Sequence, residues 1–437
     1  MRQILLSLSI VATASLAHSP ISHAEDTGVP SSDQPVRIAR LIKELGAPAY
    51  LRRQSAENDL ENLGQVTRAQ LEKVIDSDDP ELRLRARRLL KKIKLENLWQ
   101  GSTVSLVAEE LKASEAVIAI SDQTGNDLAI GDQYASFNDV AISLQHPESL
   151  FWQAVDDVCR KSHNRVRSRY GDNPSGLVFA SGQIGLYPVA YAGPVRAQLT
   201  SAKRIFVEDF DYEDRSSDTT HTFQINMVMT WEDKFRLVAH QSHLTVGSAT
   251  ANEPIRIIDH RPAESGWQVV SGGARQYSTA LRIQPPPQSA HRLTQLTLNW
   301  DMIAVGDMDT LVIDDLSPGL VHRKGDIGAI VNSSHGSDTR WQLTLAVSRD
   351  LIIPKPSEVL FVENKFELYD DQQRAFTHLS SSRLGVTQGA ARMKLVFEAP
   401  ADNSVPTRLV IRYPRIRDRR NLAITFHDVP LPSAVPE

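Results

Sequence analysis

The densest group of residues able to bind a metal lies in the stretch EDFDYEDRSSD, residues 208–218. Carboxylate oxygens are the hard ligands that Ca²⁺ prefers. The glycine and terminal glutamate of an EF-hand are absent, and a solvated loop between two strands would carry the same charges. The stretch therefore has two interpretations, a solvated loop and a calcium site. The calcium candidates are Asp209, Asp211, Glu213, Asp214 and Asp218.

A second candidate is the pair of histidines in AHQSH, His240 and His243. An odd separation on a strand points two side chains to opposite faces. The apolar alternation that reaches Ala239 resumes at Leu244 on the opposite parity, which predicts a bulge between the histidines. Neither a carboxylate nor a further histidine follows at zinc-motif spacing, so two polar residues at a strand irregularity are favoured over a zinc pair.

Recognisable catalytic motifs are missing from the sequence. It contains no GxSxG, HExxH, P-loop or dinucleotide-binding glycine pattern. The single cysteine, Cys159, extends an apolar face with Val155 and Val158, which is typical of a small buried hydrophobe and not of a nucleophile. We predict no catalytic residue, no cofactor and no internal disulfide.

Four tryptophans lie in the second half of the chain, where strands predominate. Exposed Trp rings on one sheet face could stack on sugars, but a Trp that ends an alternating strand more often packs in a core or at an edge. Core packing is the favoured interpretation, with a carbohydrate-binding face as the alternative. The four residues are Trp231, Trp267, Trp300 and Trp341.

The first 24 residues have the form of a signal peptide. Arg2 precedes an apolar run, Ile4–Ala17, and small residues stand at Ser22 and Ala24. The run is too short for a stable membrane anchor, and no later stretch reaches about twenty apolar residues. We therefore expect an exported protein of the bacterial periplasm or cell surface, with no membrane span after cleavage and a linker over residues 25–36.

Residues 77–94, SDDPELRLRARRLLKKIK, raise the possibility of nucleic-acid binding. Leu82, Ala86 and Leu89 begin an apolar stripe at helical spacing, so the basic residues fall on the exposed face of a helix, with long stems beside the stripe. Asp79 and Pro80 suit the start of that helix. Because the chain has a formal charge of −5 and no second basic patch, a solvated helix face is favoured and no nucleic-acid partner is expected.

Residues 37–96 are predicted to form a block of four short helices. The segments SAENDLENLG, AQLEKVI and DSDDPELRLRARRLLKKI resemble HEAT/armadillo-type helical repeats over about residues 37–95. That resemblance implies a protein-binding scaffold. The alternative is a plain four-helix cap on the domain that follows.

Residues 101–185 are predicted to form a small domain with the order β-α-β-β-α-β-β. The stretches ISDQTGNDLAI and DVAISLQHPESLFWQAVDDVCRKSHNRVRSRYGDNPSGLVFASG resemble the short N-terminal domain of secretins and TonB-dependent receptors. Gln123, Thr124 and Gly125 match the end of that family's first helix, and Val140, Ile142 and Leu144 match the strand that precedes its second helix. Because no channel-forming segment follows, the resemblance implies an interaction module only.

From residue 186 the chain is predicted to be almost entirely β. Alternation such as Phe223/Ile225/Met227 predicts antiparallel β-sandwich domains, which we place at 186–284 and 288–437 with a boundary at QPPPQ (284–288). A hairpin is expected in ELYDDQQRAF, 367–376, with its turn at Asp370-Asp371. The fold class is thus multidomain α+β: a helical repeat block, a small α+β domain and β-sandwiches.

These features favour a non-enzymatic, exported envelope protein that serves as a protein-interaction or scaffold module with an envelope protein partner. Two alternatives stay open. One is a β-sandwich protein that binds carbohydrate or cell wall, and the other is a hydrolase whose site is assembled between domains.

Overall fold

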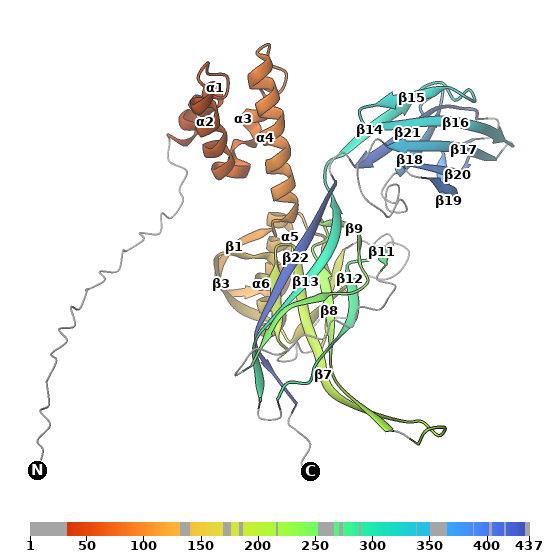
Figure 1. Ribbon diagram of the computed structural model, residues 1–437. Coiled ribbons are helices and arrows are strands. Elements are labelled where there is room, and N and C mark those ends of the chain that lie inside the picture. Colours follow the sequence, from red (N-terminus) through yellow and green to blue (C-terminus); the bar gives the residue numbers. More distant parts are fainter. Residues whose placement is uncertain are drawn as a thin grey trace, which may run out of the picture. The chain divides into compact units, whose positions relative to one another are not determined.

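The computed structural model describes residues 33–131, 140–168, 176–182, 187–215, 217–251, 266–270, 274–287, 290–337, 339–349, 365–387, 389–401, 404–414 and 417–432 (Figure 1). Of these residues 54% lie in strands and 23% in helices. The chain divides into two compact units, residues 1–91 and 92–437. The predicted signal peptide, 1–24, lies outside the described residues, and the first helix begins at Gln34, inside the predicted linker. Within the described part, no helix is both long and apolar enough to cross a bilayer.

The helical block consists of α1 (Gln34–Glu44), α2 (Tyr50–Leu63), the 3-10 helix η1 (Gly64–Thr67), α3 (Arg68–Glu72) and α4 (Pro80–Trp99), which continues into the second unit. The predicted start of α4 is confirmed: Asp79 Oδ1 accepts hydrogen bonds from the backbone N–H groups of Glu81 (2.9 Å) and Leu82 (3.3 Å). The predicted apolar stripes supply most of the buried side chains. These are Ile38, Leu41, Ile42, Leu45, Ala56, Leu60, Leu71, Ala86, Leu89, Leu90 and Ile93.

The prediction of a HEAT/armadillo repeat is wrong. The helix α3 has only five residues and follows a 3-10 turn, whereas α4 has twenty, so no pair of helices repeats. The expectation that Arg85 stays solvated is also wrong, because its guanidinium is buried against the Glu57 carboxylate. Leu51 on α2 is 79% exposed although it is apolar. The spacing of apolar residues predicts which face of the helix is buried. It does not predict which charged side chain beside that face forms a buried ion pair, as Arg85 does with Glu57.

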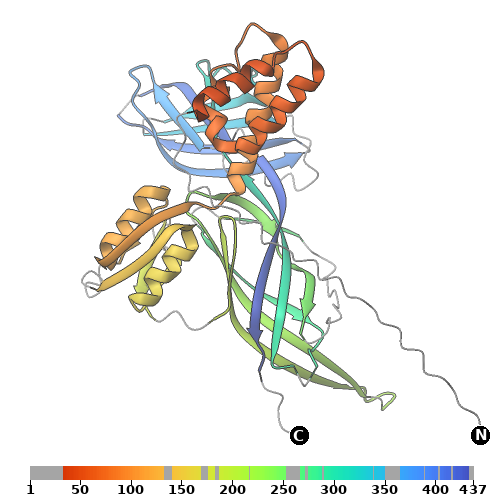
Figure 2. The ribbon, with the colours of Figure 1, turned by 90° about the vertical axis from the view of Figure 1, so that its left-hand side faces the viewer.

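The small α+β region follows the predicted order. It comprises β1 (Thr103–Lys112), α5 (Ala113–Thr124), β2 (Leu128–Ile130), β3 (Ala141–Leu150), α6 (Phe151–Lys161), β4 (Asn164–Ser168) and β5 (Leu177–Ser181). The strands β1 and β3 are antiparallel, and β2, β5 and β4 form a separate mixed sheet. The helices α5 and α6 lie side by side, orange and yellow in Figure 2, and share one core with the strands. Cys159 is buried in that core, as predicted, and burial raises the pKa of its thiol.

Two sheets enclose the central core. The first has the order β12-β8-β7-β6, from Gln276–Ile283, Ser217–Trp231, Val195–Phe210 and Val189–Ala192. The second is built on β13 (Arg292–Val305), with β22 (Arg417–Pro430) on one edge and β9 (Arg236–Gln241) and β10 (Thr245–Thr250) on the other; β11 (Trp267–Val269) pairs with β9. The alternating residues predicted for β8, Phe223 to Trp231, are all buried in this core.

The bulge predicted between His240 and His243 is confirmed. His240 lies opposite Met302 of β13, and Thr245 lies opposite Asn299. Between these two pairs the chain advances by five residues from β9 to β10 but by only three along β13. The two extra residues form a bend between β9 and β10.

The core does not divide at QPPPQ. The strand β13 begins after this stretch but pairs with β9 and β10, which precede it, and residues from both sides share the central core. The region from 308 to 414 is instead inserted between β13 and β22, which pair from Arg292–Pro430 to Val305–Arg417. A linker rich in proline interrupts hydrogen bonding along the chain without preventing its flanks from packing together.

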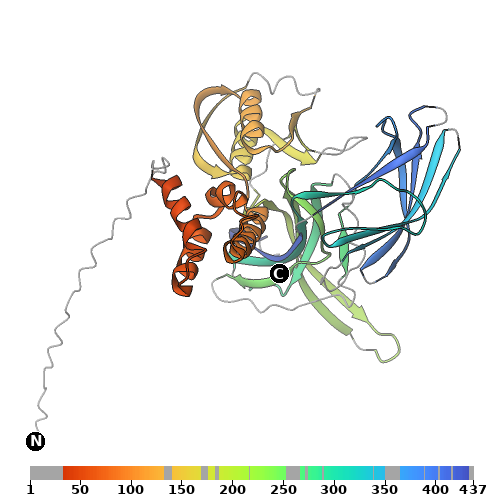
Figure 3. The same cartoon turned by 90° about the horizontal axis from the view of Figure 1, so that it is seen from above.

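The inserted region is an antiparallel sandwich (cyan to blue in Figure 3). One sheet contains β14 (Met308–Ile313), β21 (Pro406–Pro414) and β18 (Lys365–Asp370), and the other β15 (Val321–Lys324), β16 (Ile327–Gly336), β17 (Arg340–Arg349), β20 (Ala390–Glu398) and β19 (Thr377–Thr387). A separate core fills it. The predicted hairpin turn follows Asp370, and a bridge joins Tyr369 to Ala375.

A buried carboxylate joins the α+β region to the central sheets. Glu232, in the turn between β8 and β9, is fully buried and accepts hydrogen bonds from Ser102 N (2.8 Å), Ser102 Oγ and Asn126 Nδ2 (3.1 Å). Burial raises the pKa of the Glu232 carboxyl, and the hydrogen bonds from Ser102 and Asn126 oppose that shift. Nearby, the indole of Trp152 donates to the Pro194 carbonyl at 2.9 Å. These contacts fix the base of the β7–β8 hairpin.

Candidate functional site

The outer half of the β7–β8 hairpin extends beyond the sheet to which its base belongs. The two strands pair from Val195–Trp231 to Phe210–Ser217. Their neighbours stop earlier, since β6 ends at the pair Val189–Gln198 and β12 at Ile283–Phe223. Among the described strands, residues 205–222 therefore pair only with one another. We call this segment the ribbon; Figure 1 shows it projecting past the end of the sheet.

A bulge in β7 decides which side chains share a face of the ribbon. The register shifts between Leu199 and Ser201, so that Phe206 lies opposite His221 and Phe210 opposite Ser217. These pairs have the parity of Phe223, which is buried in the central core. The apolar face of the sheet thus continues past the last core residue. Arg204, whose guanidinium lies 5.9 Å from the centroid of the Phe223 ring, marks the end of the core.

Three aromatic side chains of the ribbon are exposed to solvent: Phe206 and Phe210 on this continuation, and Tyr212 in the connecting turn. Their exposed fractions are 60%, 49% and 87%. The Phe206 ring meets His221 edge to face at 4.7 Å between centroids, and Phe210 meets Tyr212 in the same way at 5.0 Å. We call these three residues the aromatic ridge. Grouped apolar surface of this kind typically marks an interaction site, and aromatic residues dominate such sites energetically.

The ribbon is strongly acidic. Residues 205–222 contain six carboxylates and one arginine, a formal charge of −5, which equals that of the whole chain. Asp209 lies directly opposite Asp218 across the two strands, an arrangement of like charges that destabilises a hairpin. A positively charged surface placed against the ribbon would relieve this repulsion.

The calcium candidates lie on the ribbon, but the structure does not gather them around a common point. Asp209 and Asp218 are on paired strands, whereas Asp211, Glu213 and Asp214 are in the connecting turn, where Asp211 Oδ1 accepts a hydrogen bond from Glu213 N at 2.7 Å. All five are exposed. Within the described residues, no three His, Cys, Asp or Glu side chains form a metal-binding group.

The histidine candidates belong to no metal-binding group among the described residues, and His243 is half-buried in the bend after β9. His240 is buried, its Nδ1 donates to the Gln241 carbonyl at 2.8 Å, and its ring lies 4.2 Å from Tyr277 and 5.0 Å from Trp300 between centroids. Burial lowers the pKa of His240, and the hydrogen bond to Gln241 opposes that shift. The side chain is therefore a neutral core residue.

The tryptophans follow the core-packing interpretation in two of four cases. Trp231 and Trp300 are buried in the central core, so their rings are not available for stacking on a sugar. Trp267 and Trp341 are half-buried and belong to different sheets; Arg419 covers Trp267 at 5.1 Å, and Trp341 packs over Gly336. The four rings do not make a common platform.

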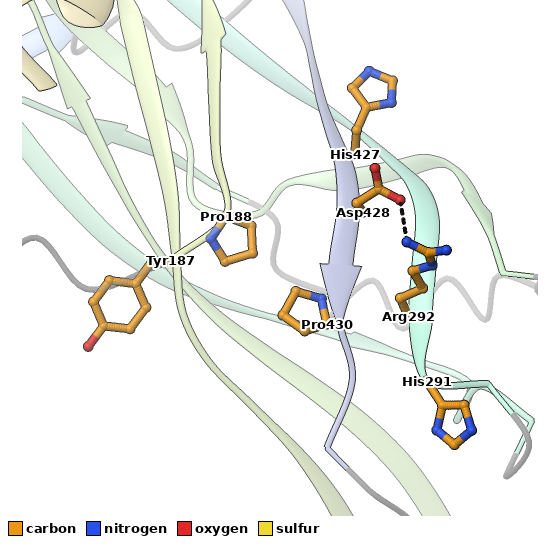
Figure 4. Close-up of a pocket in the computed structure, with 7 residues that line it drawn as sticks. All are labelled: Tyr187, Pro188, His291, Arg292, His427, Asp428 and Pro430. Carbon is orange, nitrogen blue, oxygen red and sulfur yellow. Dashed lines mark hydrogen bonds and ion pairs between the residues drawn. The ribbon is translucent and has the colours of Figure 1, made fainter. Parts of the chain in front are cut away.

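An open hollow lies where β13 begins and β22 ends, and Figure 4 shows its lining. Arg292 and Asp428 form an exposed ion pair at 3.3 Å, with His291 and His427 on either side of it. An exposed ion pair contributes little to stability or binding. Because the imidazoles do not point toward a shared position, the hollow has no arrangement suited to catalysis.

Comparison of the chain with models of protein families, with curated proteins and with solved structures finds no match. The expected resemblances to HEAT/armadillo repeats and to the short N-terminal domain of secretins and TonB-dependent receptors are therefore not upheld as family assignments. The structure has the predicted element order β-α-β-β-α-β-β, but no family model matches the chain.

Sequence reasoning located the acidic stretch but missed the aromatic ridge within it. Phe206 and Phe210 stand at even spacing among the carboxylates, which is a signal for one face of a strand, and Tyr212 follows in the turn. Their common face with the core strand β8 depends on the bulge near Thr200, which the sequence does not mark with a glycine or proline.

Proposed function

We propose that this chain is a non-enzymatic, exported protein of the bacterial envelope that binds a partner protein through the aromatic ridge. The observation that carries the proposal is the continuation of a core-forming sheet face into solvent, with three exposed aromatic rings at its end. A two-stranded ribbon alone is marginal in water, and packing of its apolar face against a partner supplies the missing layer.

The charge of the ribbon specifies the partner's chemistry. The occupant that complements it is an apolar groove bordered by lysine or arginine side chains on a different protein. Such a surface buries the rings, and its positive charge complements the ribbon's formal charge of −5. An anionic membrane surface would be repelled by the same charges.

A photo-cross-linking residue tests the proposal in cells that naturally produce the chain. It is placed at Phe210, and in a matched control at Leu384, an exposed apolar residue (55%) on β19 of the inserted sandwich. We expect one discrete adduct from Phe210 that is absent from Leu384, containing a second protein. The purified pair should then bind more weakly as salt rises, because the rim contacts are ionic.

Two outcomes would overturn the proposal. One is an equal pattern of adducts from Phe210 and Leu384. The other is an adduct that contains only a second copy of this chain, with sedimentation of the purified protein showing self-association through the ribbon.

A further inference from the structure

A second, independent feature is a cavity of about 380 Å³ between the α+β region and the base of the β7–β8 hairpin. Its floor is formed by Arg196, Thr230 and Gln276, which lie opposite one another on the adjacent strands β7, β8 and β12. Directly opposed residues in a sheet share a face, so these three side chains form one polar row. The facing wall is the edge strand β4 with Arg165 and Arg167.

The cavity carries an excess of positive charge. Three arginines and one carboxylate line it, a formal charge of +2. The carboxylate, Asp156, is already occupied: it accepts hydrogen bonds from Arg196 Nε (2.8 and 2.9 Å to its two oxygens) and from the Tyr191 hydroxyl (2.8 Å). It therefore compensates Arg196, and no other carboxylate among the described lining residues balances the charge of the β4 arginines.

The guanidinium of Arg196 is held in place by the residues around it. Arg196 is only 8% exposed, and besides the contact to Asp156 its Nη1 donates to Gln198 Oε1 at 2.8 Å. Its Nη2 makes no hydrogen bond with any residue that the structure describes. A buried guanidinium that still has free donors and lines a cavity is preorganised for a ligand that accepts hydrogen bonds.

The side chain of Arg165 is also held in position, by its packing against Gly182. A Cβ atom at Gly182 would lie 2.9 Å from Arg165 Nε, so the arginine side chain packs over this glycine. Gly182 has φ = +133°, a conformation that disfavours any residue with a side chain. The close approach therefore depends on glycine at this position.

We infer that this cavity binds a small oxyanion, a carboxylate or a phosphate group, through Arg165, Arg167 and Arg196. Guanidinium groups pair with both kinds of anion through parallel N–H donors. The volume is that of a small-molecule site. Among the described residues, the lining contains no histidine, cysteine or lysine, and Asp156 is engaged by Arg196 and Tyr191, so these residues suit binding more than acid–base chemistry. A ligand here would contact the α+β region and the central sheet together, and would stabilise both.

Calorimetric titration of the full chain with inorganic phosphate and, separately, with succinate tests this inference. We expect one site for at least one probe, and the stronger of the two identifies the anion class. Arg165→Gln and Arg167→Gln should each raise Kd about tenfold, the effect of losing roughly 1.4 kcal/mol of charge-assisted hydrogen bonding. Arg392→Gln, an exposed arginine on β20 of the inserted sandwich, is the matched control and should leave Kd unchanged.

Gly182→Ala provides a variant that keeps every charge. It should displace Arg165 and weaken binding less than Arg165→Gln does, while the melting temperature without ligand reports whether the chain still folds. The inference is overturned if neither anion binds at concentrations up to about 10 mM, a limit that corresponds to negligible affinity. It is equally overturned if Arg165→Gln, Arg167→Gln and Arg392→Gln all bind as the unaltered protein does.

Discussion

The base and the outer half of the β7–β8 hairpin follow the same alternation and differ in what covers them. At the base, Phe223, Ile225 and Met227 are buried by the sheet built on β13. In the ribbon, Phe206 and Phe210 occupy the same face and are exposed. The strands β7 and β8 pair with each other in both halves, but only the base is flanked by β6 and β12 and covered by a second sheet. A fully hydrogen-bonded hairpin can therefore still leave its apolar face uncovered. In the proposed function, a partner protein covers that face.

The largest expected difference concerns stability. Phe223→Ala should lower the free energy of unfolding of the central core by about 3–5 kcal/mol, since the ring is fully buried. Phe210→Ala should change it by less than about 0.5 kcal/mol, as is usual for surface positions. Denaturant unfolding followed by the fluorescence of the core residues Trp231 and Trp300 measures both. Similar losses in the two variants would contradict the distinction between base and ribbon.

A second prediction concerns the anchoring of the base through Glu232. Because burial raises the folded-state pKa above the ordinary value of 4.5, the folded protein retains a proton that the unfolded chain releases. The contribution of this group to stability is therefore greatest below pH 4.5 and falls as pH rises toward the folded-state pKa. A tenfold difference in proton affinity between the folded and unfolded states is worth about 1.4 kcal/mol of stability.

Glu232→Gln should remove this dependence, so that the stability of the central core falls less steeply above pH 4.5 than in the unaltered protein. Melting temperatures at a series of pH values provide the measurement. Glu208→Gln, an exposed carboxyl on the ribbon, is the control and should leave the slope as it is. A slope that does not change in Glu232→Gln would show that the buried carboxyl does not titrate in this way.

The smallest effect is expected from the repulsion between Asp209 and Asp218. Asp218→Lys converts a like-charged cross-strand pair into an attractive one and should stabilise the ribbon by up to about 1 kcal/mol. Hydrogen exchange of the amides in residues 205–222 reports on this segment directly. Partner binding should move in the opposite direction, weakening as negative charge is lost. Slower exchange together with tighter binding would contradict the assigned charge complementarity.

The parts of the fold that depend on local pattern were predictable. The apolar stripe of α4 with Asp79 before it, and the alternation from Phe223 to Trp231, identified those elements and their buried faces. The parts that depend on distant partners were not. The pairing of β13 with β22 joins residues more than a hundred positions apart, and the burial of Arg85 and Glu232 depends on Glu57 and Ser102.

The candidate site was predictable only in its charge. The carboxylates of residues 208–218 were evident, but a run of charges does not distinguish a metal site from a binding surface. The ridge depends on the one-residue register shift near Thr200, which reverses the face of every side chain after it. Nothing in the local sequence signals that shift.

The binding role of the aromatic ridge can be measured as the affinity of the protein captured at Phe210 for a variant with Phe206, Phe210 and Tyr212 all replaced by serine. The account predicts a rise in Kd of more than about a hundredfold, because aromatic anchors each contribute about 2 kcal/mol or more, with an unchanged melting temperature. The control replaces Leu379 and Leu384, exposed apolar residues of β19, and should bind almost as the unaltered chain does. Equal affinities for the ridge variant and the control would contradict the account.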